Sequence, residues 1–422
     1  MRLRHALALT ASVGAAGLVL APAATAATPD DSVAYLAGQL EAGGDRLTVE
    51  SGGQTYDDLG LTIDAVLAMS AAGSGGDASA AATDYVVANA GSYYGYGEDV
   101  YAAATGKLLT FASARGLDPR SVGGVDLVAQ LQSLEADSGQ FVDRSQWGDY
   151  SNTLGQAFGI IGLKRAGTNP TPASVDFLLA QQCEDGGFSL EFADGCVSDP
   201  DATSTAVQAL AAVGGQDAAV QDAADYLEGR QGQDGGVGGG ATTEGANANS
   251  TGLAATAFAV AGRDDARAQA LGYLDSLTFG CETPALAGAV AYNRADFDAA
   301  VAQGAQAAPD GTITRSTAQA LMGRTDSSYV TVTSGAQTAA TPALDCAAPA
   351  PGDDDSAGSG SDTGSGDAGP DDDATAQPEI PAVVQTDGAV SATPVWALGL
   401  GAGLGALVLT LAVRRRAAAR VR

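Results

Sequence analysis

Glycines that recur at the ends of helical segments constrain the fold of this chain more than any other feature. Runs rich in alanine and leucine end in glycine at intervals of 43, 51, 47, 48 and 61 residues, at Gly73, Gly116, Gly167, Gly214, Gly262 and Gly323. Glycine in that place is typical of a helix C-cap, because it adopts positive φ without strain. The recurrence indicates a repeat protein whose units each read as helix, glycine-rich loop, helix.

The repeats predict an all-α domain over residues 28–346, built from six helix pairs. The second helix of a unit starts with polar residues that suit N-capping, as in Asp149-Tyr-Ser-Asn-Thr, Asp199-Pro-Asp-Ala-Thr and Asn247-Ala-Asn-Ser-Thr. These second helices are also richer in small residues. We therefore expect them to pack closely together as an inner layer, with the first helices outside.

The two ends of the chain predict export and membrane anchoring. Residues 1–26 combine Arg2 and Arg4 with a short apolar run and an Ala-x-Ala site, which is typical of a cleaved signal peptide; an uncleaved anchor is the alternative. Residues 395–413 carry no charge and predict one transmembrane helix, and the arginines of 414–422 predict a cytoplasmic tail. Residues 347–394 are rich in Asp, Gly, Ser and Pro and predict a disordered stalk.

This layout predicts a single-pass protein on the extracellular face of the cell membrane, with its N-terminus outside and its C-terminus inside. The membrane is then a partner through the C-terminal helix. No Leu-Pro-x-Thr-Gly pentapeptide is present, so we expect the helix to be retained rather than cleaved by a sortase.

Charge and histidine content narrow the possible functions. Outside the predicted signal peptide and tail, 13 basic residues stand against 50 acidic ones, a net charge of −37. Such a field repels nucleic acid, so no nucleic-acid partner is expected. The single histidine, His5, lies in the signal peptide. The mature protein therefore lacks the histidine of Ser-His-Asp or Cys-His catalysis and of His-ligated zinc.

Four cysteines lie in the predicted extracellular domain: Cys183, Cys196, Cys281 and Cys346. An even number outside the cell predicts disulfides, for which three pairings exist. Spacing favours Cys183–Cys196, which closes a glycine-rich loop, and Cys281–Cys346, which ties the last helical region to the segment before the stalk. A reactive thiol is the alternative.

Two loops carry a motif that resembles a known family. It reads Gln182-x-x-x-Gly186-Gly187-Phe188 in one unit and Gln231-x-x-x-Gly235-Gly236-Val237 in the next. It resembles the Gln-x-x-x-Gly-x-Trp motif of terpenoid cyclases and the related repeats of protein prenyltransferases. Over about residues 30–340 the chain is similar to exported bacterial proteins described as prenyltransferase/squalene-oxidase-repeat proteins.

The resemblance implies an α6/α6 toroid, in which six inner helices are ringed by six outer ones. Vitamin B12-binding intrinsic factor and thioester-containing complement domains share that toroid, so the fold alone does not give a function. Protein prenyltransferases hold zinc with Asp, Cys and His, and the missing histidine argues against that activity. We therefore expect no metal and no cofactor, with a corrinoid or Ca²⁺ as the remaining options.

Asp199-Pro200-Asp201-Ala202-Thr203 resembles the Asp-x-Asp-Asp-Thr motif of class II terpene cyclases. The resemblance would make Asp201 the general acid and Asp199 the residue that tunes it, although Ala202 replaces the last aspartate. N-capping of the inner helix is the alternative, and it is favoured because polar residues recur in this place. A content of 5% aromatic residues also argues against a cavity that stabilises carbocations.

Aromatic and polar residues gather in the loops that lead into the inner helices, which in a toroid meet at one end of the ring. They predict a ligand-binding rim, with packing of the loop ends as the alternative. The predicted rim residues are Tyr93, Tyr96, Trp147, Tyr150, Phe188, Asp199, Asp201 and Asn249.

Together these features favour a membrane-anchored toroid at the cell surface that binds an unidentified small molecule or a surface protein, rather than an enzyme. A divergent class II cyclase that uses Asp201 is the first alternative, and a structural or adhesive protein is the second.

Overall fold

A computed structural model describes the chain over residues 28–51, 54–193, 195–240, 245–344 and 346. The predicted signal peptide (1–26), stalk (347–394), transmembrane helix (395–413) and tail (414–422) lie outside the described residues. Among the helices that are described, none is both long and apolar enough to span a membrane.

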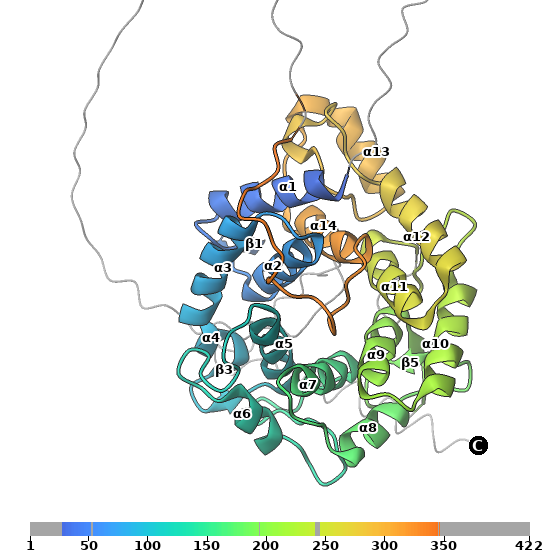
Figure 1. The fold of residues 1–422 in the computed structure, drawn as a ribbon. Coiled ribbons are helices and arrows are strands. Elements are labelled where there is room, and N and C mark those ends of the chain that lie inside the picture. The colour runs from blue at the N-terminus through green and yellow to red at the C-terminus, as the bar shows by residue number, and fades with distance from the viewer. Residues whose placement is uncertain (1–27, 52–53, 194, 241–244, 345, 347–422) are drawn as a thin grey trace, which may run out of the picture.

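Helices form two concentric layers around a common axis (Figure 1). The inner layer consists of α2 (Leu59–Ala72), α5 (Ala102–Ala114), α7 (Thr153–Arg165), α9 (Pro200–Val213), α11 (Ala248–Ala261) and α14 (Gly311–Gly323). Each inner helix packs against the next in this order, and α14 packs against α2. The inner layer is therefore a closed ring.

The outer layer is less regular. It contains α1 (Pro29–Ala42), α3 (Gly76–Ala88), α4 (Ala90–Tyr94), α6 (Leu127–Ser133), α8 (Pro172–Leu179), α10 (Asp217–Arg230), α12 (Asp264–Ser276) and α13 (Arg294–Gln303). Two helices separate α2 from α5 along the chain, and two separate α11 from α14. The predicted helical toroid is confirmed, whereas a count of six equal helix pairs is not.

Short elements complete the described chain. Three two-stranded antiparallel hairpins pair β1 (Thr48–Ser51) with β2 (Gln54–Asp57), β3 (Gly95–Tyr96) with β4 (Asp99–Val100), and β5 (Phe188–Ser189) with β6 (Ser198–Asp199). Two 3₁₀ turns, η1 (Pro284–Leu286) and η2 (Gly304–Gln306), flank α13.

The two ends of the inner helices differ in chemistry, as the sequence predicted. At the N-terminal ends of five inner helices, the side chain of the N-cap residue accepts a backbone N–H group of the first turn. The capping residues are Asp58, Asn152, Asp199, Asn247 and Asp310. At the C-terminal ends, three of the predicted glycines are C-caps with φ of 77°, 76° and 74°: Gly73, Gly214 and Gly262. Polar caps therefore gather at one end of the ring and glycine turns at the other.

Small residues allow the inner helices to approach one another closely. A Cβ atom built on Gly106 of α5 would lie 2.7 Å from the backbone nitrogen of Gly159 in α7. A Cβ atom on Gly252 of α11 would lie 2.4 Å from the carbonyl oxygen of Gln319 in α14. Backbone contacts of this kind explain why the inner helices are rich in glycine and alanine.

The repeated glutamine motif joins neighbouring units. Gln182 Nε2 donates to the carbonyl oxygens of Gly186, in its own loop, and Ala219, in the next outer helix, both at 2.9 Å. Thr203, in the following inner helix, accepts the backbone N–H of Phe188 at 2.8 Å. The second motif repeats these contacts. The motif that carries the family resemblance is thus a structural device that holds inner and outer layers together.

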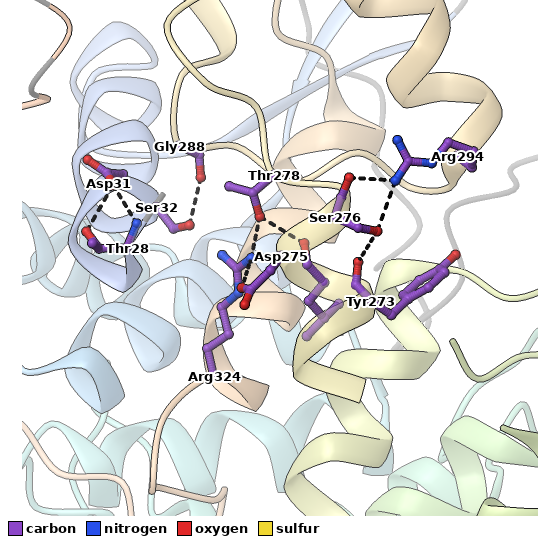
Figure 2. Close-up of polar contacts among 11 residues, drawn as sticks. Thr28, Asp31, Ser32, Tyr273, Asp275, Ser276, Thr278, Gly288, Arg294 and Arg324 are labelled. Carbon is purple, nitrogen blue, oxygen red and sulfur yellow. Dashed lines mark hydrogen bonds and ion pairs between the residues drawn. The ribbon is translucent and has the colours of Figure 1, made fainter. Parts of the chain in front are cut away.

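Polar contacts tie the first helix of the domain to the last units (Figure 2). The Ser32 hydroxyl of α1 donates to the Gly288 carbonyl oxygen at 2.7 Å, and Arg324, directly after α14, donates to Asp275 of α12 at 2.9 Å. Gly288 has φ of 81°, and a Cβ atom there would lie 2.2 Å from the carbonyl oxygen of Asp31. Only glycine fits at this contact, which fixes α1 against the end of the domain.

Both favoured disulfides are present. Cys183–Cys196 has its Cα atoms 5.5 Å apart and Cys281–Cys346 has them 5.3 Å apart, both within the ordinary range for a disulfide. No free cysteine is found among the described residues. The pairing predicted from spacing is confirmed.

Candidate functional site

The interior of the ring holds a buried ion pair that joins two inner helices. Lys107 of α5 lies 2.7 Å from the Asp64 carboxylate of α2, and each side chain is only 4% exposed. Lys107 Nζ also donates to the Gly60 carbonyl oxygen at 3.3 Å and lies 6.0 Å from the centre of the Phe158 ring. A second pair joins Arg315 of α14 to Asp58 at 2.8 Å. Each of these two buried or partly buried basic side chains therefore lies in an ion pair with an aspartate of α2 or of its N-cap.

Tyr329 occupies the ring interior next to this pair. It follows α14 in the chain, is 3% exposed, and its ring centre lies 4.9 Å from that of Phe158 in α7. Burial raises the pKa of its hydroxyl well above the ordinary value, and the carboxylates of Asp64 and Asp201 raise the pKa further. The phenol therefore lies within the electrostatic reach of both aspartates.

Asp201 lies in the first turn of α9 and is 3% exposed. Its backbone N–H is capped by the Asp199 carboxylate, which accepts from Asp201 at 2.9 Å and from Ala202 at 3.0 Å. Capping, the favoured alternative for this motif, is thus confirmed for Asp199. The same contacts show that the Asp201 carboxyl is not the cap of α9.

One face of α9 turns toward Tyr329. Asp201, Ser204 and Gln208 are spaced three and four residues apart and so lie along the same side of the helix. Gln208 Oε1 accepts the backbone N–H of Tyr329 at 2.9 Å. The Ser204 hydroxyl is buried and finds no hydrogen-bond partner among the described residues. This face brings a carboxyl and a hydroxyl to the ring interior, beside the Tyr329 and Phe158 rings.

The residues predicted for a ligand rim do not lie in one environment. Tyr96, Trp147 and Tyr150 are 47%, 63% and 49% exposed, and the Tyr150 hydroxyl donates to the Trp147 carbonyl oxygen at 2.8 Å. The other predicted residues are almost fully buried: Tyr93, Phe188, Asp199, Asp201 and Asn249. The exposed aromatics come from two loops that pair through Val100 and Arg144.

Three of the buried residues have distinct surroundings. The pKa of the Tyr93 hydroxyl is raised well above its ordinary value by burial first, and then by Asp64 and Asp58. This hydroxyl has no hydrogen-bond partner within the described part of the chain. Phe188 packs in the core, and Asn249 takes the place in α11 that Asp201 takes in α9.

Sequence reasoning missed Asp64, Lys107 and Tyr329. A signal for the first two was present, because each is the only charged residue of its helix, α2 and α5. Single opposite charges in neighbouring, otherwise uncharged inner helices indicate a buried pair. Tyr329 gave no comparable signal, since it follows the last helix of the repeat.

The described residues contain no group of three or more His, Cys, Asp or Glu side chains that could hold a metal ion. The site built from the residues that are present is therefore a carboxyl, a hydroxyl and two aromatic rings beside a neutral ion pair.

No protein-family model and no curated protein matches the chain. Solved structures do share its fold. A protein from Actinoplanes has 19% sequence identity and a TM-score of 0.52, over 70% of this chain and 98% of its own. A variant of the type II terpene cyclase MstE from Scytonema, with its substrate geranylgeranyl dihydroxybenzoate, has 16% identity and a TM-score of 0.51, over 71% and 97%. ent-Copalyl diphosphate synthase from Streptomyces platensis matches at 18% identity, over 63% and 50%, with a TM-score of only 0.42.

These likenesses show that the chain has an α/α-toroid fold, as the resemblance implied. They also correct one prediction. The sequence favoured a protein that is not an enzyme, and that prediction is contradicted, because a type II terpene cyclase, which is an enzyme, shares the fold. At such identities the likeness itself shows the fold alone, so the reaction has to be argued from the site.

Proposed function

We propose that the protein is an enzyme that uses Asp201 as a general acid on a hydrophobic, isoprenoid-like substrate held inside the ring. The observation that carries the proposal is the division of labour in the Asp199-Pro200-Asp201 motif. Asp199 caps α9, and Asp201 sits on the face of α9 that meets the ring interior. A type II terpene cyclase with the same fold acts on a geranylgeranyl substrate, which supports this substrate class.

The surroundings suit acid catalysis on an alkene. A carboxyl in its protonated form can donate a proton to an alkene, and the 3% exposure of Asp201 keeps bulk water away from that step. The Phe158 and Tyr329 rings offer π faces to a developing positive charge. Asp64 neutralises the positive charge of Lys107, so Lys107 does not repel the developing charge on the substrate.

In the proposed step the Asp201 O–H bond breaks and its proton adds to one carbon of a substrate alkene. Asp201 becomes a carboxylate, and the positive charge appears on the adjacent carbon. A second alkene of the same substrate attacks that carbon, which forms the ring C–C bond and moves the charge along the chain. Loss of a proton to water ends the sequence, and Asp201 regains a proton from water. The net reaction is an isomerisation.

A substrate panel tests the proposal. The purified protein is incubated with geranylgeranyl dihydroxybenzoate, squalene and geranylgeranyl diphosphate, and cyclised products are detected by mass spectrometry. Asp201→Asn should lower product formation by about 100-fold or more, since general acids contribute that much to catalysis. Asp310→Asn, a matched control that keeps the N-cap of α14, should retain activity. Equal activity of the Asp201→Asn variant and the parent would refute the role of Asp201.

We further propose that the domain is displayed on the extracellular face of the cell membrane, anchored by residues 395–413. Two disulfides support an oxidising compartment. Labelling of intact cells with a membrane-impermeant amine reagent should modify Lys164, which is near the surface at the end of α7. Labelling only after lysis would contradict display at the surface.

A further inference from the structure

The chain does not leave the ring after its last inner helix. Residues 325–344, orange in Figure 1, turn from α14 across the centre of the ring toward α2. Residues 327–344 contain no charged side chain, although the chain as a whole is strongly acidic. An uncharged segment of this length can be enclosed without the cost of burying charge.

The first part of the segment is held by the middle of the ring. The guanidinium group of Arg165, the last residue of α7, donates to the carbonyl oxygens of Tyr329, Val330 and Val332. Gln208 of α9 accepts the Tyr329 N–H at 2.9 Å. These contacts satisfy backbone groups that would otherwise be buried without partners.

The second part is fixed across the glycine ends of α5 and α2. Gln337 Oε1 accepts from Arg115 at 2.7 Å, while its Nε2 donates to the Ser74 carbonyl oxygen at 2.8 Å and to Ser79 at 2.9 Å. The Ser334 N–H donates to the Ala114 carbonyl oxygen at 3.0 Å. The segment therefore spans the C-terminal ends of α7, α5 and α2, and the Arg165, Arg115 and Ser79 side chains hold it there.

Its inward-pointing residues reach the candidate site. Tyr329 and Val332 are 3% and 0% exposed, whereas Thr331 between them is exposed. The Tyr329 ring packs on Phe158, and its hydroxyl is within the electrostatic reach of Asp64 and Asp201. A side chain from outside the repeats thus takes part of the space that the inner helices enclose.

We propose that residues 327–332 form the closed end of the substrate site and that Tyr329 limits the size of the hydrophobic substrate that fits beside Asp201. The inference rests on the proposed site at the ring interior. It assigns specificity to a segment that follows the repeats, so that substrate size is set by one side chain held in place by Arg165 and Gln208 rather than by the ring helices.

Binding measurements in an Asp201→Asn background test the inference without requiring any reaction. Geraniol, farnesol and geranylgeraniol are titrated into the parent background and into the same background with Tyr329→Ala. Removal of the phenol ring should tighten geranylgeraniol binding at least about tenfold and leave geraniol binding within about twofold, because only the longer chain gains buried apolar surface. Tyr273→Ala, which deletes a buried tyrosine of outer helix α12, is the matched control and should change neither affinity.

If Tyr329→Ala does not fold by circular dichroism, Tyr329→Leu replaces it, with the same direction and a smaller change. An unchanged preference among the three alcohols, or no binding of any of them to either protein, would overturn the inference. Tighter binding of geranylgeraniol to the Tyr329→Ala variant, together with no cyclised product from the protein that keeps Asp201, would support the role of Tyr329 in substrate size and refute the acid reaction.

Discussion

The buried ion pair between Lys107 and Asp64 offers a quantitative test of how the ring interior is stabilised. At 2.7 Å and an effective dielectric constant of about 20, the two charges attract each other by about 6 kcal/mol. Desolvation of both groups offsets most of this gain, so the pair itself contributes little net stability. Removal of one partner is different, because the other charge is then left buried alone.

Lys107→Met should therefore lower the free energy of unfolding by about 3–5 kcal/mol. Combining it with Asp64→Leu removes the stranded carboxylate and should recover most of that loss. The assay is urea denaturation followed by far-UV circular dichroism, in which a lower midpoint at unchanged slope reports lost stability. A matched control is Arg120→Ala, because Arg120 pairs with Asp126 at 3.3 Å on the surface, where the side chains are 51% and 37% exposed.

The control should cost less than about 1 kcal/mol, as exposed pairs do. A Lys107→Met variant as stable as Arg120→Ala would refute the view that Asp64 is charged and enclosed. A double variant no more stable than Lys107→Met would show that packing, rather than charge, explains the loss.

Three further predictions concern stability. Gly106→Ala should lower the free energy of unfolding by about 1–3 kcal/mol in the same assay, because its Cβ atom would meet the α7 backbone. The control Gly272→Ala, whose Cβ atom would meet nothing within 4 Å, should be neutral or stabilise by up to about 1 kcal/mol. Equal effects of the two substitutions would contradict the close packing of α5 and α7. Replacing Cys281 and Cys346 by serine should lower the free energy of unfolding by about 4 kcal/mol, and replacing Cys183 and Cys196 by about 3 kcal/mol, because a disulfide that closes a longer loop restricts the unfolded chain more. A reversed order would argue against this explanation. Above about pH 10 the tyrosines of the unfolded chain lose their phenol protons, whereas buried tyrosines such as Tyr329 keep theirs in the folded protein, because burial raises the pKa. The free energy of unfolding should therefore fall with rising pH, by up to about 1.4 kcal/mol per pH unit for each such tyrosine. Tyr329→Phe should reduce that slope when urea denaturation is repeated at several pH values.

Local signals in the sequence predicted much of the ring. The ends of three inner helices could be predicted at Gly73, Gly214 and Gly262, because glycine is the residue that adopts positive φ without strain, and a glycine is visible in the sequence itself. The Gln182 motif predicted the toroid for the same reason, since its contacts are confined to neighbouring units. The irregular outer layer escaped prediction, because the 43-residue interval from Gly73 to Gly116 holds two outer helices, α3 and α4, without being longer than the other intervals.

The ring interior was predicted only in part. Asp201 was found through a motif. Tyr329 lies more than a hundred residues further along the chain, in a segment after the last repeat, so the helical repeat gives no information about where it packs. Likewise, the exposure of Trp147 depends on how its loop packs against the β3–β4 hairpin. Such contacts are decided by the closed shape, which local patterns do not encode.

Closure of the ring by α14 has a consequence for how the chain must fold. In a linear solenoid, removal of a terminal repeat shortens the array and leaves the rest in place. Here α14 fills the space between α11 and α2, so a chain that stops before residue 311 leaves two apolar helix faces without partners. Contacts between the first and last inner helices are among the most distant in the sequence, which slows folding and exposes partly built rings to aggregation. The domain is therefore complete only when its last helix is made, and we expect even short deletions there to act on the whole ring.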